Sequence, residues 1–412
     1  MSNRRWCILC LVAATLVPAS ALACLWDYDT LQMERSRFPS ILELITGKFL
    51  RHTPEFYRWR IDDRLRKLKD EPDRLDYYDD LAVAYEKVGD HNKAIETILE
   101  KDKKKPGLYE TEANLGTFLI HAGRFEEGLK HIDAALGINP DAHFGREKYQ
   151  KKLVEYVISR QKDGKTPLPL VSLVDPHRFS FRDFLIVPGT DKIPPIIDEG
   201  ERKAAVKGVL GMMRFGNYDS PVLLEALGDL LRNESGIYGK DKDYTDEKQL
   251  AARAYLKASY AMNDQVARDA YREKASMART SQSKYRDSEV ELPLEELEQS
   301  FQKELADADE WFAGVCNDEV TWIREGKDPE QEFTRKYYDE PQVAADTSEL
   351  LPQAPFFQNP RSRGPIVFAG VVLTLMVLST LAIWHWWSAR RARLATRDVA
   401  PLPSSSQAIR LP

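Results

Sequence analysis

We expect an all-α protein built on a helical repeat, and three observations in the 412-residue chain predict it. Prolines recur at Pro72, Pro106 and Pro140 with a constant step, since 106 − 72 and 140 − 106 both equal 34. Two stretches, LAVAYEKVGDHNKAIETI and LGTFLIHAGRFEEGLKHI, stand in the same register. Elsewhere apolar residues recur at steps of three and four, which is the spacing of one helix face. A fixed step of this length indicates stacked helix pairs.

At these residues the chain resembles the tetratricopeptide repeat (TPR) family, in its bacterial form with a signal peptide and one C-terminal membrane helix. The signature positions are occupied by Tyr78, Leu81, Ala82, Tyr85, Gly89, Ala94, Ile98 and Pro106 in the first repeat, and by Leu115, Gly116, Leu119, Gly123, Ile132, Ala135 and Pro140 in the second. The resemblance implies a TPR-like superhelix whose first helices line a concave groove for extended peptides or partner helices.

The second repeat departs from the family pattern at two positions. Glu112 stands where the first repeat has Tyr78, and Gly128 where it has Ala94. A glycine inside a helix costs about 1 kcal/mol relative to alanine. We therefore expect the second repeat to be the less stable of the two.

The whole chain divides into ten segments by composition and periodicity. They are a signal peptide 1–23, a degenerate helical cap 24–74, the repeats 75–108 and 109–142, a capping helix 143–164, a Pro-rich connector 165–199, a second helical lobe 200–325 with a degenerate repeat and a long helical hairpin, a Pro-rich stalk 326–365, a transmembrane helix 366–387 and a basic cytoplasmic tail 388–412.

Two features of the second lobe and its connector lead to specific expectations. The stretch RFSFRDFLIV, residues 178–187, predicts one short extended segment. A Ser–Pro pair at 220–221 predicts a helix start, with serine as the cap. In 293–325 an apolar stripe at helical spacing predicts a long helix that packs against the second lobe; the alternative is a homodimer seam formed by 264–325.

The two ends of the chain predict export and membrane anchoring. Arg4 and Arg5 precede a short apolar run that ends in Ala-x-Ala, as in a secretory signal. The segment 366–387 carries no formal charge and is long enough to cross a bilayer, and an arginine cluster follows it. We expect a single-pass plasma (inner) membrane protein with a periplasmic or extracellular ectodomain and a cytoplasmic tail.

The residue after the predicted cut, Cys24, leaves three alternatives open. It is the new N-terminus after simple cleavage, a lipid attachment site, or one half of a disulfide with Cys316. We expect Leu25 and Trp26, which follow it, to cover the first helix of the repeat scaffold.

No catalytic or cofactor motif occurs, so we expect no enzymatic activity and no cofactor. The seven histidines include no pair at the four-residue spacing of a helical metal site, so no metal site is predicted. The net charge of −6 and the absence of a basic stripe argue against nucleic-acid binding. The alternative to a scaffold is an envelope assembly or processing factor with an unrecognised ligand or enzymatic site in 165–290.

The remaining candidate is the groove that the resemblance implies, for a protein or peptide partner. Its inner-face positions are Asp76, Asp79, Val83, Glu86, Asn114, Thr117, His121, Glu147, Lys148 and Lys151. A clamp for a C-terminal carboxylate is not favoured, because Asp79 stands where a basic or amide residue would be needed. These residues form either a groove, acidic at one end and basic at the other, or a solvated helical face.

Overall fold

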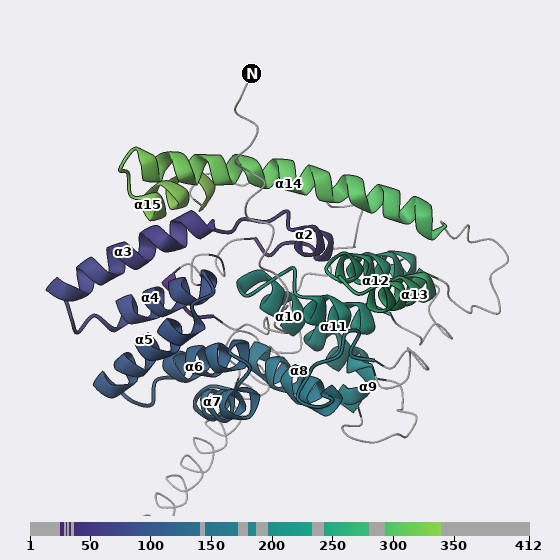
Figure 1. The fold of residues 1–412 in the computed structure, drawn as a ribbon, viewed down its shortest axis with the longest axis horizontal. Coiled ribbons are helices and arrows are strands. Elements are labelled where there is room, and N and C mark those ends of the chain that lie inside the picture. The colour runs from purple at the N-terminus through teal and green to yellow at the C-terminus, as the bar shows by residue number, and fades with distance from the viewer. Residues whose placement is uncertain are drawn as a thin grey trace, which may run out of the picture. The chain divides into compact units, whose positions relative to one another are not determined.

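The computed structural model describes residues 25–28, 30, 33, 37–140, 145–171, 180–186, 197–232, 243–279 and 293–338 (Figure 1). Within these ranges there are fourteen α-helices, α2 to α15, one π-helical turn, and an isolated bridge between Lys162 and Lys165 in place of any strand. The prediction of an all-α fold is confirmed.

The predicted signal peptide 1–23, the transmembrane helix 366–387 and the tail 388–412 lie outside the described residues, as does Cys24. Of the helices that are described, none combines the length and the hydropathy needed to cross a bilayer. The membrane anchor therefore stays a prediction.

Two helix pairs repeat with the same step that the prolines predict. The pairs are α4 (Leu75–Lys87) with α5 (His91–Lys104), and α6 (Tyr109–His121) with α7 (Phe125–Ile138). Each helix of the second pair begins and ends at a constant offset from its counterpart, since 109 − 75, 121 − 87, 125 − 91 and 138 − 104 all equal 34. The turn inside each pair contains a glycine at positive φ, Gly89 at 84° and Gly123 at 78°, where other residues are strained.

The close approach of α6 to α7 explains why the second repeat has Gly128 where the first has Ala94. A Cβ atom added to Gly128 would lie 2.7 Å from the carbonyl oxygen of Gly116 and 2.6 Å from the side chain of Ile120. Gly116 faces it, because a Cβ there would lie 3.0 Å from the Gly128 carbonyl oxygen. Gly128 therefore lowers the helix propensity of α7 but is required for the close packing of α6 against α7.

Single helices flank the two pairs on both sides. On the N-terminal side lies α3 (Pro54–Asp70), which Thr53 caps. The helix before it, α2 (Ile41–Thr46), which Ser40 and Glu43 cap reciprocally, packs instead against helices of the second lobe, so this part of the predicted cap 24–74 does not cover the repeats. On the C-terminal side lies α8 (Arg146–Arg160). The stripe Tyr149, Leu153 and Val157 on α8 is buried in the core that continues into the second lobe.

The connector contains a correction to the sequence prediction. Residues predicted as an extended segment form the short helix α9 (Phe181–Ile186). Ser180 and Asp183 cap it reciprocally, with the Ser180 N–H 3.1 Å from Asp183 Oδ2 and the Asp183 N–H 3.3 Å from Ser180 Oγ. Phe181 and Phe184, three residues apart, both pack on Tyr156, which only a helical turn allows.

The second lobe consists of four helices that pack in sequence. They are α10 (Glu199–Phe215), α11 (Pro221–Leu231), α12 (Asp243–Tyr260) and α13 (Gln265–Arg279). Ser220 caps α11 and Pro221 is its first residue, as the sequence predicts. Gly228 allows α11 to approach α12, because a Cβ atom there would lie 2.5 Å from the Tyr255 ring.

The long helix α14 (Leu294–Arg324) lies across both lobes (Figure 1). Leu297 and Phe301 are buried in the core of the second lobe. Val315 and Trp322 pack with Phe333 of α15 (Pro329–Phe333), beside α3. Much of the stripe that a homodimer seam would use is therefore covered by the chain itself.

The first part of the predicted stalk 326–365 is helical, and residues 339–365 lie outside the described residues. Residues 329–338 form α15 and the π-helical turn η2 (Thr334–Tyr338). Phe333 is buried, and Glu330 is held by two arginines of α3. Prolines at the start of the segment do not exclude a helix, since Pro329 occupies the first helical position behind the cap Asp328.

We predict that Gly128→Ala lowers the free energy of unfolding by about 1–3 kcal/mol, the usual cost of overpacking. Helix propensity alone predicts the opposite sign. Gly137→Ala on the same helix is the matched control, because nothing lies within 4 Å of its added Cβ. Urea unfolding of both variants measures the difference, and equal effects would contradict the close-packing explanation.

Candidate functional site: the inner face of the first lobe

Most of the predicted groove residues are buried, so they form neither an open groove nor a solvated face. The residues are sorted by exposure as follows: Asp79, Val83, Glu86, Asn114, Thr117, His121 and Glu147 are at most 7% exposed, Lys151 is half-buried, and Asp76 and Lys148 are exposed. We call the buried part, on α4 and α6, the inner face.

The inner face is covered by the leading segment, which is Leu25–Tyr28 with Thr30 and Met33. Asn114 on α6 makes two hydrogen bonds to the backbone of this segment. The Trp26 N–H donates to Asn114 Oδ1 at 2.8 Å, and Asn114 Nδ2 donates to the Trp26 carbonyl at 3.0 Å. The Tyr28 N–H donates to Asp80 Oδ1 at 3.0 Å. The protein thus binds a short peptide stretch of its own on this face.

Apolar contacts and one ion pair fix the leading segment further. Leu25 is 2% exposed and belongs to the cluster formed by α4, α5 and α6. The Trp26 ring meets the Tyr109 ring edge-on at 6.3 Å. Asp27 accepts from Arg60 of α3 at 3.1 Å. Leu25 and Trp26 therefore cover the first helices of both repeats, α4 and α6, and not one helix alone.

Beneath the leading segment lies a buried ion pair that the sequence does not indicate. Lys101 Nζ on α5 lies 2.7 and 2.6 Å from the two carboxylate oxygens of Asp79, and both residues are at most 6% exposed. Burial raises the pKa of Asp79 to about 7, against the opposing charge of Lys101. Asp79 is therefore a structural partner of α5 and does not face a groove.

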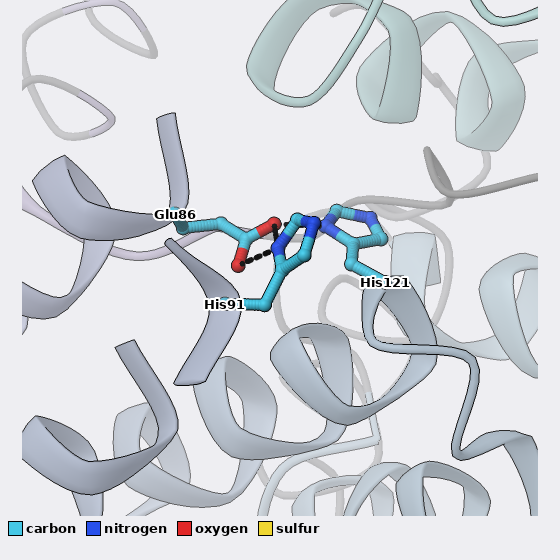
Figure 2. A group of neighbouring side chains, drawn as sticks. All are labelled: Glu86, His91 and His121. Carbon is cyan, nitrogen blue, oxygen red and sulfur yellow. Dashed lines mark hydrogen bonds and ion pairs between the residues drawn. The ribbon is translucent and has the colours of Figure 1, made fainter. Parts of the chain in front are cut away.

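Glu86 and His121 of the inner face converge with His91 of α5 at one end of it (Figure 2). Glu86 near the end of α4 contacts His121, the last residue of α6, at 2.5 Å from Oε1 to Nδ1. His91, the first residue of α5, places its own Nδ1 2.9 and 3.0 Å from the same carboxylate. Burial would raise the pKa of Glu86, but the attraction and hydrogen bonds of the two imidazoles outweigh it and lower the pKa to about 2.

The other predicted groove residues also have partners within the chain. Glu147 accepts from the Tyr109 hydroxyl at 2.8 Å, and Thr117 accepts from Gln150 at 3.1 Å. The exposed charges pair too: these are Asp76 with Arg74, Lys148 with Glu201, and Lys151 with Asp133. The predicted charge gradient along the groove is thus largely compensated by neighbouring side chains.

In the described part of the region 165–290, the buried carboxylates of α11, Glu225 and Asp229, both lie beside Lys274 of α13. Lys274 Nζ lies 2.7 Å from Glu225 and 3.1 Å from Asp229. The other donors to these carboxylates are the hydroxyls of Tyr255 and Tyr271 and the backbone N–H groups of Leu170 and Phe181. All four carboxylate oxygens are engaged, so the arrangement ties the connector and α13 to α11.

Sequence reasoning identified Asn114, Glu86 and His121 but missed what they contact. His91 was missed because it does not stand at the four-residue spacing from His121 that a single helix would need. The leading segment precedes the first helix pair by some fifty positions, and no local pattern assigns it to a partner. The only sequence signal for a binding face was the set of polar residues at positions that lie on the concave side of a superhelix.

We predict that Lys101→Met lowers the free energy of unfolding by about 3–5 kcal/mol, because it leaves the Asp79 carboxylate buried without its partner. The double variant Lys101→Met with Asp79→Leu removes both charges and should recover most of the loss. Thermal and urea unfolding of the three chains provide the measurement. Equal losses in the single and double variants would show that the pair is not coupled.

No protein-family model matches the sequence, and no curated protein matches it either. The resemblance to tetratricopeptide repeats therefore rests on the signature residues and on the helix boundaries described above.

Proposed function

We propose that this chain is a membrane-anchored helical-repeat scaffold of the tetratricopeptide type, which binds a segment of a protein partner on the non-cytosolic side. The signal-like N-terminus and the apolar run at 366–387 support this location. The helix pairs that repeat with a constant step support the class of scaffold. A segment of a protein, and not a small molecule, is the expected partner.

The observation that carries the proposal is the way Asn114 holds Trp26. Its two hydrogen bonds with Trp26 go to the backbone, so this contact does not depend on the identity of the Trp26 side chain. An amide that pairs with an N–H and a C=O of one residue is suited to any extended segment. The leading segment then acts as an internal ligand, and a partner segment binds by exchange with it.

A second property of the leading segment supports exchange. The Trp26 side chain is half-buried and Tyr28 is 43% exposed, so part of the segment reaches solvent. A cavity of about 30 Å³, room for one or two waters, lies beside Leu25 and Thr30. Segments that exchange are expected to be partly accessible, and here Trp26 and Tyr28 are accessible while Leu25, Asp27 and Thr30 are buried.

We predict that Trp26→Ala and Asn114→Ala change partner binding in opposite directions. Trp26→Ala loosens the internal ligand and increases partner recovery. Asn114→Ala removes two hydrogen bonds worth about 1 kcal/mol each and lowers recovery about tenfold or more. Proximity labelling with the intact membrane-bound protein, quantified against the unmodified chain, is the measurement.

Tyr28→Ala is the matched control, because it lies on the same segment and its side chain is exposed. It should leave recovery unchanged. The proposal fails if Trp26→Ala and Asn114→Ala both leave the labelled proteins unchanged while the variants stay folded, since the leading segment is then only a structural part of the lobe.

A further inference from the structure

We propose that Glu86, His91 and His121 bind one divalent transition-metal ion, with zinc as the preferred ion. This site goes beyond the proposed scaffold function and does not depend on it. The three side chains come from the end of α4, the start of α5 and the end of α6 (Figure 2). A bound ion would join three helices of both repeats at one point.

The geometry of the donor atoms fits such an ion. The three residues offer ligand atoms that all lie within 4.8 Å of one another. Both imidazoles direct Nδ1 at the one carboxylate, at 2.5 Å for His121 and 2.9 Å for His91. Tetrahedral zinc separates its ligand atoms by roughly 3.3 Å, since each lies about 2.0–2.1 Å from the ion. The two nitrogen–oxygen distances need to lengthen by less than about 1 Å to admit it.

The backbone around the three side chains favours a cation. Glu86 is the penultimate residue of α4 and His121 is the last residue of α6, so the negative ends of two helix dipoles meet here, against one positive end, that of α5 at His91. The nearest cationic side chain in sequence, Lys87, points away and donates to the carbonyls of Phe215 and Gly216. A carboxylate at a helix C-terminus is unfavourable by itself and becomes favourable beside a cation.

The His121 ring provides an independent observation. It is 7% exposed, and its second nitrogen, Nε2, is buried without a hydrogen-bond partner. The hydrogen bond that positions the ring is at Nδ1, on the side of Glu86 and His91.

The site also has an entry path and an open position. The His91 side chain is 29% exposed, whereas those of Glu86 and His121 are 4% and 6% exposed, so an ion enters past His91. Two imidazoles and one carboxylate leave the fourth position of a tetrahedral ion for water or for a partner's ligand. An ion bound at both Nδ1 atoms requires each imidazole to be neutral with its proton on Nε2.

The test is zinc titration of the full chain after treatment with a chelator. Calorimetry measures the stoichiometry and the dissociation constant, and the absorption of Co²⁺ in the same site reports its coordination. We expect one zinc ion per chain, a Co²⁺ spectrum of four- or five-coordinate type, and a higher unfolding temperature with zinc. Zinc affinity should fall at least about tenfold in His91→Gln and further in His121→Gln.

The matched control is His131→Gln. His131 pairs with Glu112 at 2.7 Å on the same lobe, without a second histidine described beside them. It should leave zinc affinity unchanged. His91→Gln alters a partly exposed residue, so its folding, checked by circular dichroism, is expected to be intact. Equal zinc binding by the unmodified chain and the His91→Gln variant, or a Co²⁺ spectrum of octahedral type in both, would overturn the proposal.

Discussion

Ion pairs made by two buried arginines of α3 hold the elements of the first lobe together. Arg60 and Arg64 are at most 3% exposed, and a buried guanidinium is tolerated only when acceptors surround it. Besides Asp63 of α3 itself, those acceptors are Asp27 of the leading segment, Asp80 of α4 and Glu330 of α15. The last three come from three different elements, so α3 buries its charges together with residues 27 and 330.

This constraint explains why the inner face is closed. Once Asp27 is held by Arg60, the backbone that precedes it lies along α4 and α6, where Asn114 pairs with Trp26. The polar residues of the inner face then have partners within the chain, which removes the cost of burying them. Opening the face for another protein segment means replacing these contacts, and the backbone-directed pairing of Asn114 is the contact that another segment can reproduce.

Three differences between sequence and structure have physical causes. Phe181 and Phe184 lie in a stretch that reads as a strand, yet both pack on Tyr156 as a helical turn. Gly128 looked like a weakness of its helix but permits the approach of α6 to α7. At these two places a tertiary contact outweighed the local preference. Pro329 looked like the start of a stalk but begins a helix, because proline is tolerated at the first helical position behind the cap Asp328.

The helices of the two repeats, and much of their boundaries, could be predicted from the sequence, because the repeat step, the turn glycines and the apolar spacing are local signals. Asn114, Glu86 and His121 could also be assigned to one face. The contacts of that face could not be predicted, because they depend on the tertiary structure. Trp26 lies 88 residues from Asn114, and Glu86 lies 35 from His121. Contacts between residues so far apart in the sequence form only when the helices pack together. The free energy that favours this packing comes from burial of the whole face.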